Sequence, residues 1–263
     1  MKQDRRRSGK ARDRMDEERF LELARDPNHI PGVYNYCDRW CERCDKQEKC
    51  LVFAVEQEQG DSGEDLFESV GTGLDIAQNL LTEAMEESGL DPEAPDVESQ
   101  DEPDPFGGIR SHPLVQQAEQ YAFGTASRLE PVQHAVVSAA QAVQHKVELG
   151  VTPIQGLTLG DLEQCREAVE TVLHFRFLIC SKIFRALSGI APQRDGRPDP
   201  HSSEDGRLSA QVAWKGIQRS IEAWLTLRNA FPEREAGALE MLLQLDRLRR
   251  EVEDKFPLLA NPA

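Results

Sequence analysis

The sequence predicts an all-α protein, in which a bundle of about five main helices follows a small cysteine-rich metal-binding module. Three observations support this class. From residue 66 onward, apolar residues recur at steps of three and four, the period of amphipathic helices. Strand-like alternation and Asn-Gly hairpin turns are not found in the sequence. Four of the six cysteines fall between positions 37 and 50.

The first part of the chain divides by composition. Residues 1–32 are expected to form a basic arm and a short helix near residues 17–26, because the first 14 residues hold seven basic and two acidic side chains. Residues 33–56 form the cysteine module, and a polar, glycine-containing linker is expected to follow it.

The helical bundle is expected to span residues 64–260. Its first helix begins near Leu66, and we expect its apolar stripe to face the core; the stripe is Phe67, Val70, Leu74, Ala77, Leu81 and Ala84. Residues 91–107 are rich in acids and prolines and cannot bury a face, so they are predicted to be a disordered linker.

Later segments supply the other helices. Pro113 is suited to open one helix, and Pro131 is expected to interrupt it and to start another, which ends before Gly150. Asp161 is predicted to cap a long helix that ends near Ile190 and is apolar around most of its circumference, which is typical of a central helix. The last two helices are expected at about 208–231 and 234–255.

Charge and hydropathy exclude several classes of function. The formal net charge of −16 disfavours a body that binds nucleic acid, so only the basic N-terminal arm is a candidate for such contact. The sequence has no run of 18 apolar residues, so no membrane span is predicted. The basic N-terminus is not followed by an apolar core, so we do not expect it to be a secretory signal. We therefore expect a cytoplasmic protein with reduced thiols and a protein partner.

The cysteine module carries the strongest chemical prediction. Cys37, Cys41, Cys44 and Cys50 follow the spacing C-x3-C-x2-C-x5-C. Four thiolates close together repel one another unless a cation neutralises them, and sulfur ligands select zinc or iron–sulfur clusters over magnesium or calcium. These four residues are therefore predicted to be both the metal ligands and the cofactor-binding residues.

The choice between the two metals depends on how the thiols are spread. If the segment were helical, Cys37, Cys41 and Cys44 would share one face, at distances that suit an iron–sulfur cluster, expected as [4Fe–4S], better than one zinc ion. Nearby aromatic side chains could shield a cluster or anchor a zinc module; they are Tyr34, Tyr36, Trp40 and Phe53. The cluster is the first expectation and zinc the alternative.

Two resemblances bear on this segment. Its first three cysteines match the spacing of radical S-adenosylmethionine enzymes, but those enzymes need an α/β barrel, which this sequence does not predict. The wider segment, with KIFRALSG and AWKGIQRSIEAW, resembles uncharacterised helical bacterial proteins. That resemblance implies a helical fold and no activity.

A second candidate metal site lies on the long helix. Glu163, Glu167, Glu170 and His174 share one stripe, as carboxylates of a di-iron bundle would. The Glu-x3-His spacing departs from the usual Glu-x-x-His, and no matching motif occurs elsewhere, so a solvated face is the simpler interpretation.

These patterns leave three functional hypotheses. The first is an iron–sulfur protein in electron transfer or redox sensing. The second is an interaction scaffold without enzymatic activity, stabilised by zinc. The third is a di-metal carboxylate oxidoreductase inside the bundle. Whether the protein is an enzyme is left open.

Overall fold

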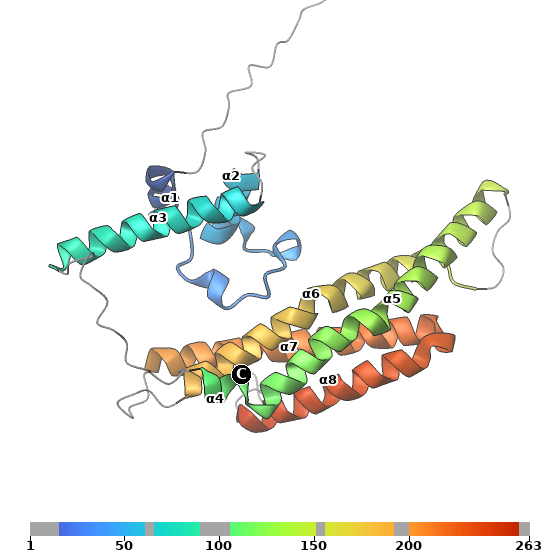
Figure 1. Cartoon of the computed structure of the whole chain (residues 1–263). Coiled ribbons are helices and arrows are strands. Elements are labelled where there is room, and N and C mark those ends of the chain that lie inside the picture. Colours follow the sequence, from blue (N-terminus) through green and yellow to red (C-terminus); the bar gives the residue numbers. More distant parts are fainter. Residues whose placement is uncertain (1–15, 61–65, 90–105, 151–155, 192–199, 258–263) are drawn as a thin grey trace, which may run out of the picture. The chain divides into compact units, whose positions relative to one another are not determined.

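The computed structural model describes residues 16–60, 66–89, 106–150, 156–191 and 200–257. Within these ranges the regular secondary structure is entirely helical, which confirms the all-α class. Contacts divide the chain into two units, residues 1–101 and 102–263 (Figure 1). No helix in the described ranges is long and apolar enough to cross a membrane. The basic arm and most of the acidic linker predicted above lie outside the described residues.

In the described part of the first unit there are three α-helices, α1 (Glu17–Ala24), α2 (Leu51–Gly60) and α3 (Leu66–Glu87). The Asp16 side chain caps α1 by accepting a hydrogen bond from the backbone N–H of Arg19 at 2.8 Å. The Arg19 guanidinium then binds the carboxylate of Glu58, which joins α1 to α2. Asn79 of α3 donates to Glu17 of α1 at 3.3 Å.

The cysteine module lies between α1 and α2 and contains three short 3₁₀ turns, η1 (Val33–Asn35), η2 (Cys41–Arg43) and η3 (Gln47–Lys49). One backbone hydrogen bond, from the N–H of Ile30 to the carbonyl of Lys49 at 2.9 Å, closes this segment into a loop. The module is therefore not one helix, and the premise that its cysteines share a helical face is wrong. Hydrogen bonds that turn back after three residues, together with a left-handed Arg39, keep the chain compact.

The second unit is a four-helix bundle. Its helices are α5 (Pro113–Glu148), α6 (Leu159–Ile190), α7 (Pro200–Ala230) and α8 (Glu235–Lys255), preceded by the short α4 (Gly107–Arg110). Contacts run from α5 to α6, α6 to α7, α7 to α8 and α8 back to α5, so the helices surround one core. Its largest fully buried side chains include Trp224, Tyr121, Phe175, Met241 and Leu245. The other long helix, α3, is not part of this bundle, because its contacts place it in the first unit.

Pro131 does not interrupt its helix, contrary to the prediction, because α5 runs through it to Glu148. A proline in a helix leaves the carbonyl four residues earlier without its donor, here that of Ser127. Ser127 and Pro131 are both exposed, so water can satisfy that carbonyl. Leu129 and Val132 are buried on the other side of the helix and hold it against the bundle.

Two helix starts also differ from the predictions. Thr158 is the N-cap of α6, and Asp161 is the reciprocal acceptor of a capping box three residues later. The helix α7 begins at Pro200, well before residue 208. Its first turns lie against the end of α6, where a Cβ added to Gly189 would be 2.7 Å from the Cα of Gly206. This close packing stabilises the helical conformation of residues 200–207, although their composition is typical of a loop.

Candidate metal centre

All four cysteines of the module line one pocket of about 60 Å³. Cys37 lies between η1 and η2, Cys41 opens η2, Cys44 follows η2, and Cys50 immediately precedes α2. The loop therefore turns back several times and brings cysteines from four points along the chain to the lining of the same space. The spacing of the cysteines predicted this convergence, although it did not predict the backbone that achieves it.

The four thiols are free, and none forms a disulfide. Cys50 is buried, and the other three are half-buried. Burial, together with the smaller effects of the negative charges of Glu56, Cys37 and Cys50, raises the pKa of Cys41 to about 11. Nearby thiolates are therefore mutually unfavourable in this pocket, which is the situation that a bound cation relieves.

Hydrogen bonds from the loop fix several of these residues. The backbone N–H of Lys46 donates to the sulfur of Cys44 at 3.4 Å. The thiol of Cys37 lies 3.5 Å from the carbonyl of Tyr34. The side-chain amide of Gln47 donates to the carbonyl of Cys41, which connects η3 to η2. The Lys46 N–H stabilises the sulfur of Cys44 in its charged form, as a metal ligand requires, whereas the Tyr34 carbonyl accepts from Cys37 as a neutral thiol.

Aromatic side chains cover part of the pocket. Tyr34, Trp40 and Phe53 line it, whereas Tyr36 is not among the lining residues and is largely exposed. The guanidinium of Arg43 lies over the Trp40 ring at 4.0 Å from its centroid, a cation–π contact that holds the indole in place. Three of the four aromatic residues singled out in the sequence therefore belong to the site.

The side chains do not have the geometry of a finished metal site. In the ranges that the structure describes, no group of three or more His, Cys, Asp or Glu side chains is placed to hold a metal ion. The four thiols share a pocket, but they would have to turn toward a common point to ligate one ion. The predicted metal centre thus stays a prediction.

The carboxylate stripe on α6 is an exposed ladder of ion pairs. Arg166 binds Glu163 at 2.6 Å and also pairs with Glu170, and its guanidinium lowers the pKa of Glu163. Glu167 is exposed, and His174 is half-buried. Because Arg166 already pairs with Glu163 and Glu170 on a largely exposed face, this stripe has the features of a solvated helix face, and the di-metal hypothesis gains no support.

The two remaining cysteines lie on α6 in the bundle. Cys165 is buried and Cys180 is half-buried. Burial raises the pKa of both thiols, as expected of thiols that pack as small apolar groups. Neither lines the pocket of the module, so they serve as natural controls for it.

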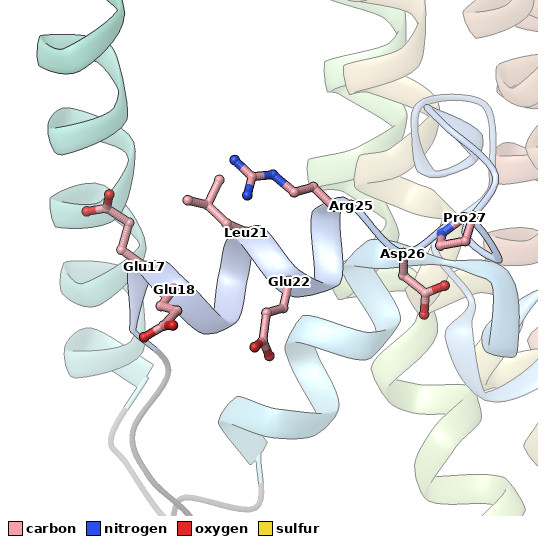
Figure 2. Close-up of a pocket in the computed structure, with 7 residues that line it drawn as sticks. All are labelled: Glu17, Glu18, Leu21, Glu22, Arg25, Asp26 and Pro27. Carbon is pink, nitrogen blue, oxygen red and sulfur yellow. The ribbon is translucent and has the colours of Figure 1, made fainter.

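A broad acidic groove lies on α1, and no motif in the sequence indicates it. Figure 2 shows its lining side chains along α1 and the turn that follows it. The groove measures about 840 Å³, and its lining is Glu17, Glu18, Leu21, Glu22, Arg25, Asp26 and Pro27. Its carboxylates are largely solvated, and it contains no nucleophile, so it resembles an ordinary charged surface more than a reaction site.

Comparisons with protein-family models, curated proteins and solved structures found no match to this chain.

Proposed function

We propose that Cys37, Cys41, Cys44 and Cys50 bind one metal centre that holds the N-terminal module in its folded shape. The observation that carries this proposal is the convergence of all four thiols on a single small pocket. Four of the six cysteines of the chain lie within 14 residues, and all four line this one space. Thiolates gathered in this way favour zinc or iron over magnesium or calcium.

The burial pattern supports a role in stability. Between residues 16 and 58, Cys50 is the only buried residue. A segment without an apolar core needs another source of folding free energy, such as a disulfide or a structural metal. The thiols here are unpaired, so a metal is the cross-link that their chemistry supports.

A single zinc ion suits the pocket best. Zinc takes four thiolates at about 2.3 Å, which brings the sulfurs within about 3.8 Å of one another. A cavity of about 60 Å³ corresponds to the volume of about two water molecules, room enough for one ion. The preference for a cluster depended on a helical segment that would hold the cysteines far apart. The backbone of the module is not helical, so that argument no longer applies.

An iron–sulfur cluster is the second candidate. The aromatic cover by Tyr34, Trp40 and Phe53 favours it, because excluding water from a cluster tunes its reduction potential. In that case the function would be electron transfer or redox sensing. With zinc, the module would be a binding element that presents its surface to a protein partner and has no catalytic role.

Metal analysis of anaerobically purified full-length protein tests the proposal. We expect one metal centre per chain, colourless with zinc, or brown with acid-labile sulfide if a cluster is bound. Cys50→Ala should abolish stoichiometric binding. Cys165→Ala, which removes another buried thiol far from the module in sequence, should leave binding unchanged. Equal metal content in the two variants, or none in the wild type, would overturn the proposal.

A further inference from the structure

The helix α3 exposes an apolar stripe that we expected to face the core. Leu74 and Leu81 are 65% and 61% exposed, and Ala77 and Ala84 on the same stripe are also exposed. The buried side of α3 is instead the one that carries Ile76. The helix has apolar residues on two sides, and within this unit only one of them is packed.

The spacing of the stripe is that of a coiled-coil seam. Its residues lie at intervals of three, four, three, four and three from position 67 to position 84. Such a 3-4 repeat keeps one face of a helix turned toward a partner helix. Bulky and small residues alternate along it: Leu74 and Leu81 take one set of positions, and Ala77 and Ala84 the other.

Two glycines flank the stripe, one on each side. Gly71 and Gly73 lie inside α3, where glycine lowers helix stability relative to alanine. A Cβ added to either one would meet no atom within 4 Å, so no contact among the described residues requires a glycine there. Glycines beside an exposed seam allow another helix to approach closely.

We propose that the partner on this stripe is α3 of a second copy of the chain, paired in antiparallel orientation. Antiparallel pairing centred between residues 75 and 76 places Leu74 opposite Ala77 of the second copy. In the same register, by position in the sequence, Leu81 is opposite Val70 and Ala84 is opposite Phe67. Every layer then joins a bulky residue to a smaller one, whereas a parallel pair would place leucine on leucine and alanine on alanine.

The charge pattern supports a second copy as the occupant. The chain carries a formal net charge of −16, so most surfaces of two copies repel each other. Apart from Glu87 at the end of α3, the positions that flank the stripe are uncharged; they are Leu66, Gly71, Gly73, Gln78, Leu80 and Met85. Contact along α3 therefore brings few charges to the interface. Because such an interface is isologous and closed by a two-fold axis, it predicts a dimer and no larger assembly.

Light scattering coupled to gel filtration tests the dimer on the full-length protein. We expect a mass of two chains that falls toward one chain on dilution from about 100 μM to about 1 μM, the behaviour of a small interface. Leu81→Glu should give one chain at every concentration. Leu243→Glu, at a leucine of similar exposure on α8, is the matched control and should leave the dimer intact.

A monomeric wild type, or a Leu81→Glu variant that stays dimeric, would overturn the proposal. If Leu81→Glu loses helical signal in circular dichroism, Leu81→Gln replaces it, because glutamine is a good helix former of similar size. A Leu81→Gln variant that stays dimeric would likewise overturn the proposal.

A photo-crosslinker tests the orientation. With p-benzoylphenylalanine in place of Met85, an antiparallel pair should crosslink to the first turn of α3 in the second copy. Mixed isotope labels distinguish this product from a crosslink within one chain. Crosslinks to residues around position 85 of the second copy would show a parallel pair and contradict the proposed register.

Discussion

Gly189 lies where α6 and α7 come into closest contact, and replacing it with alanine should destabilise the bundle. A Cβ at this position would lie 2.4 Å from the carbonyl oxygen of Ser202 and 2.7 Å from the Cα of Gly206. Both atoms belong to the backbone of α7, so no side chain can rotate away. Ordinary contacts of a Cβ lie at 3.4–4 Å, which means that the two helices would have to separate by about 1 Å.

Two opposing effects set the size of the change. Overpacking a well-packed contact lowers the free energy of unfolding by about 1–3 kcal/mol. Replacing glycine with alanine inside a helix raises it by about 1 kcal/mol. At this position the steric effect is at the upper end of its range, because backbone meets backbone. We therefore expect Gly189→Ala to lower the free energy of unfolding by about 1–2 kcal/mol.

Urea unfolding followed by circular dichroism measures this change. With a typical slope of about 2 kcal/mol per molar urea, the midpoint should fall by about 0.5–1 M. Gly124→Ala is the matched control, because its new Cβ would meet only the flexible end of Met241 at 3.8 Å. That variant should gain up to about 1 kcal/mol from helix propensity. A Gly189→Ala protein as stable as the wild type would refute the argument that this contact is too close for a side chain.

Three further predictions concern single residues. Arg39 has a φ of 58°, so Arg39→Val should lower the melting temperature of the N-terminal unit, whereas Arg39→Gly should maintain or raise it, as thermal unfolding can show. Thr158→Ala removes the α6 cap and should lower the free energy of unfolding by about 1 kcal/mol at pH 7 in urea titrations. Hydrogen bonds from Thr158 hold the pKa of Asp161 below its ordinary 3.8, so the stability that they contribute is present above that pH and is lost as the pH falls. The difference in the free energy of unfolding between Thr158→Ala and the wild type should therefore become smaller in acid. Tyr121→Phe leaves the buried indole N–H of Trp224 without its acceptor at 3.4 Å and should lower the free energy of unfolding by about 1–2 kcal/mol, measured by the same titration.

The all-α class was predictable because it depends on local periodicity. The long helix α6 illustrates this. Its apolar residues recur at helical spacing and so predict the helix, and its buried residues include Val172, Phe175 and Ile179. Burial of such a helix depends on its own pattern more than on the identity of its neighbours. The convergence of the four cysteines was foreseeable for a similar reason, since short spacings limit how far apart the thiols can lie.

The errors arose where tertiary contacts override local preference. Pro131 stays inside α5 because the carbonyl that it leaves without a donor is on the exposed side of the helix. Residues 200–207 are helical because Gly206 lies against Gly189, a pairing that distant positions in the sequence do not reveal. On α3 the sequence offers two apolar sides, and periodicity alone does not determine which one the rest of the unit covers.

The identity of the proposed metal is the least predictable feature of the account. It depends on the distances between sulfurs, and those distances follow from turns such as η2 and η3, which have no periodic pattern in the sequence. A helical interpretation of the segment favoured a cluster, whereas the looped backbone favours a single ion. The sequence thus indicated which cysteines line the pocket, whereas their role as metal ligands and the identity of the metal stay predictions.

Native mass spectrometry of air-protected, full-length protein tests the central claim most directly. The claim predicts that the native mass exceeds the mass of the denatured chain by one zinc ion, less the thiol protons that it displaces, and that Cys50→Ala removes this excess. A cluster would appear as a larger excess of iron and sulfide. Identical native and denatured masses, with all four thiols of the module open to alkylation, would contradict the account.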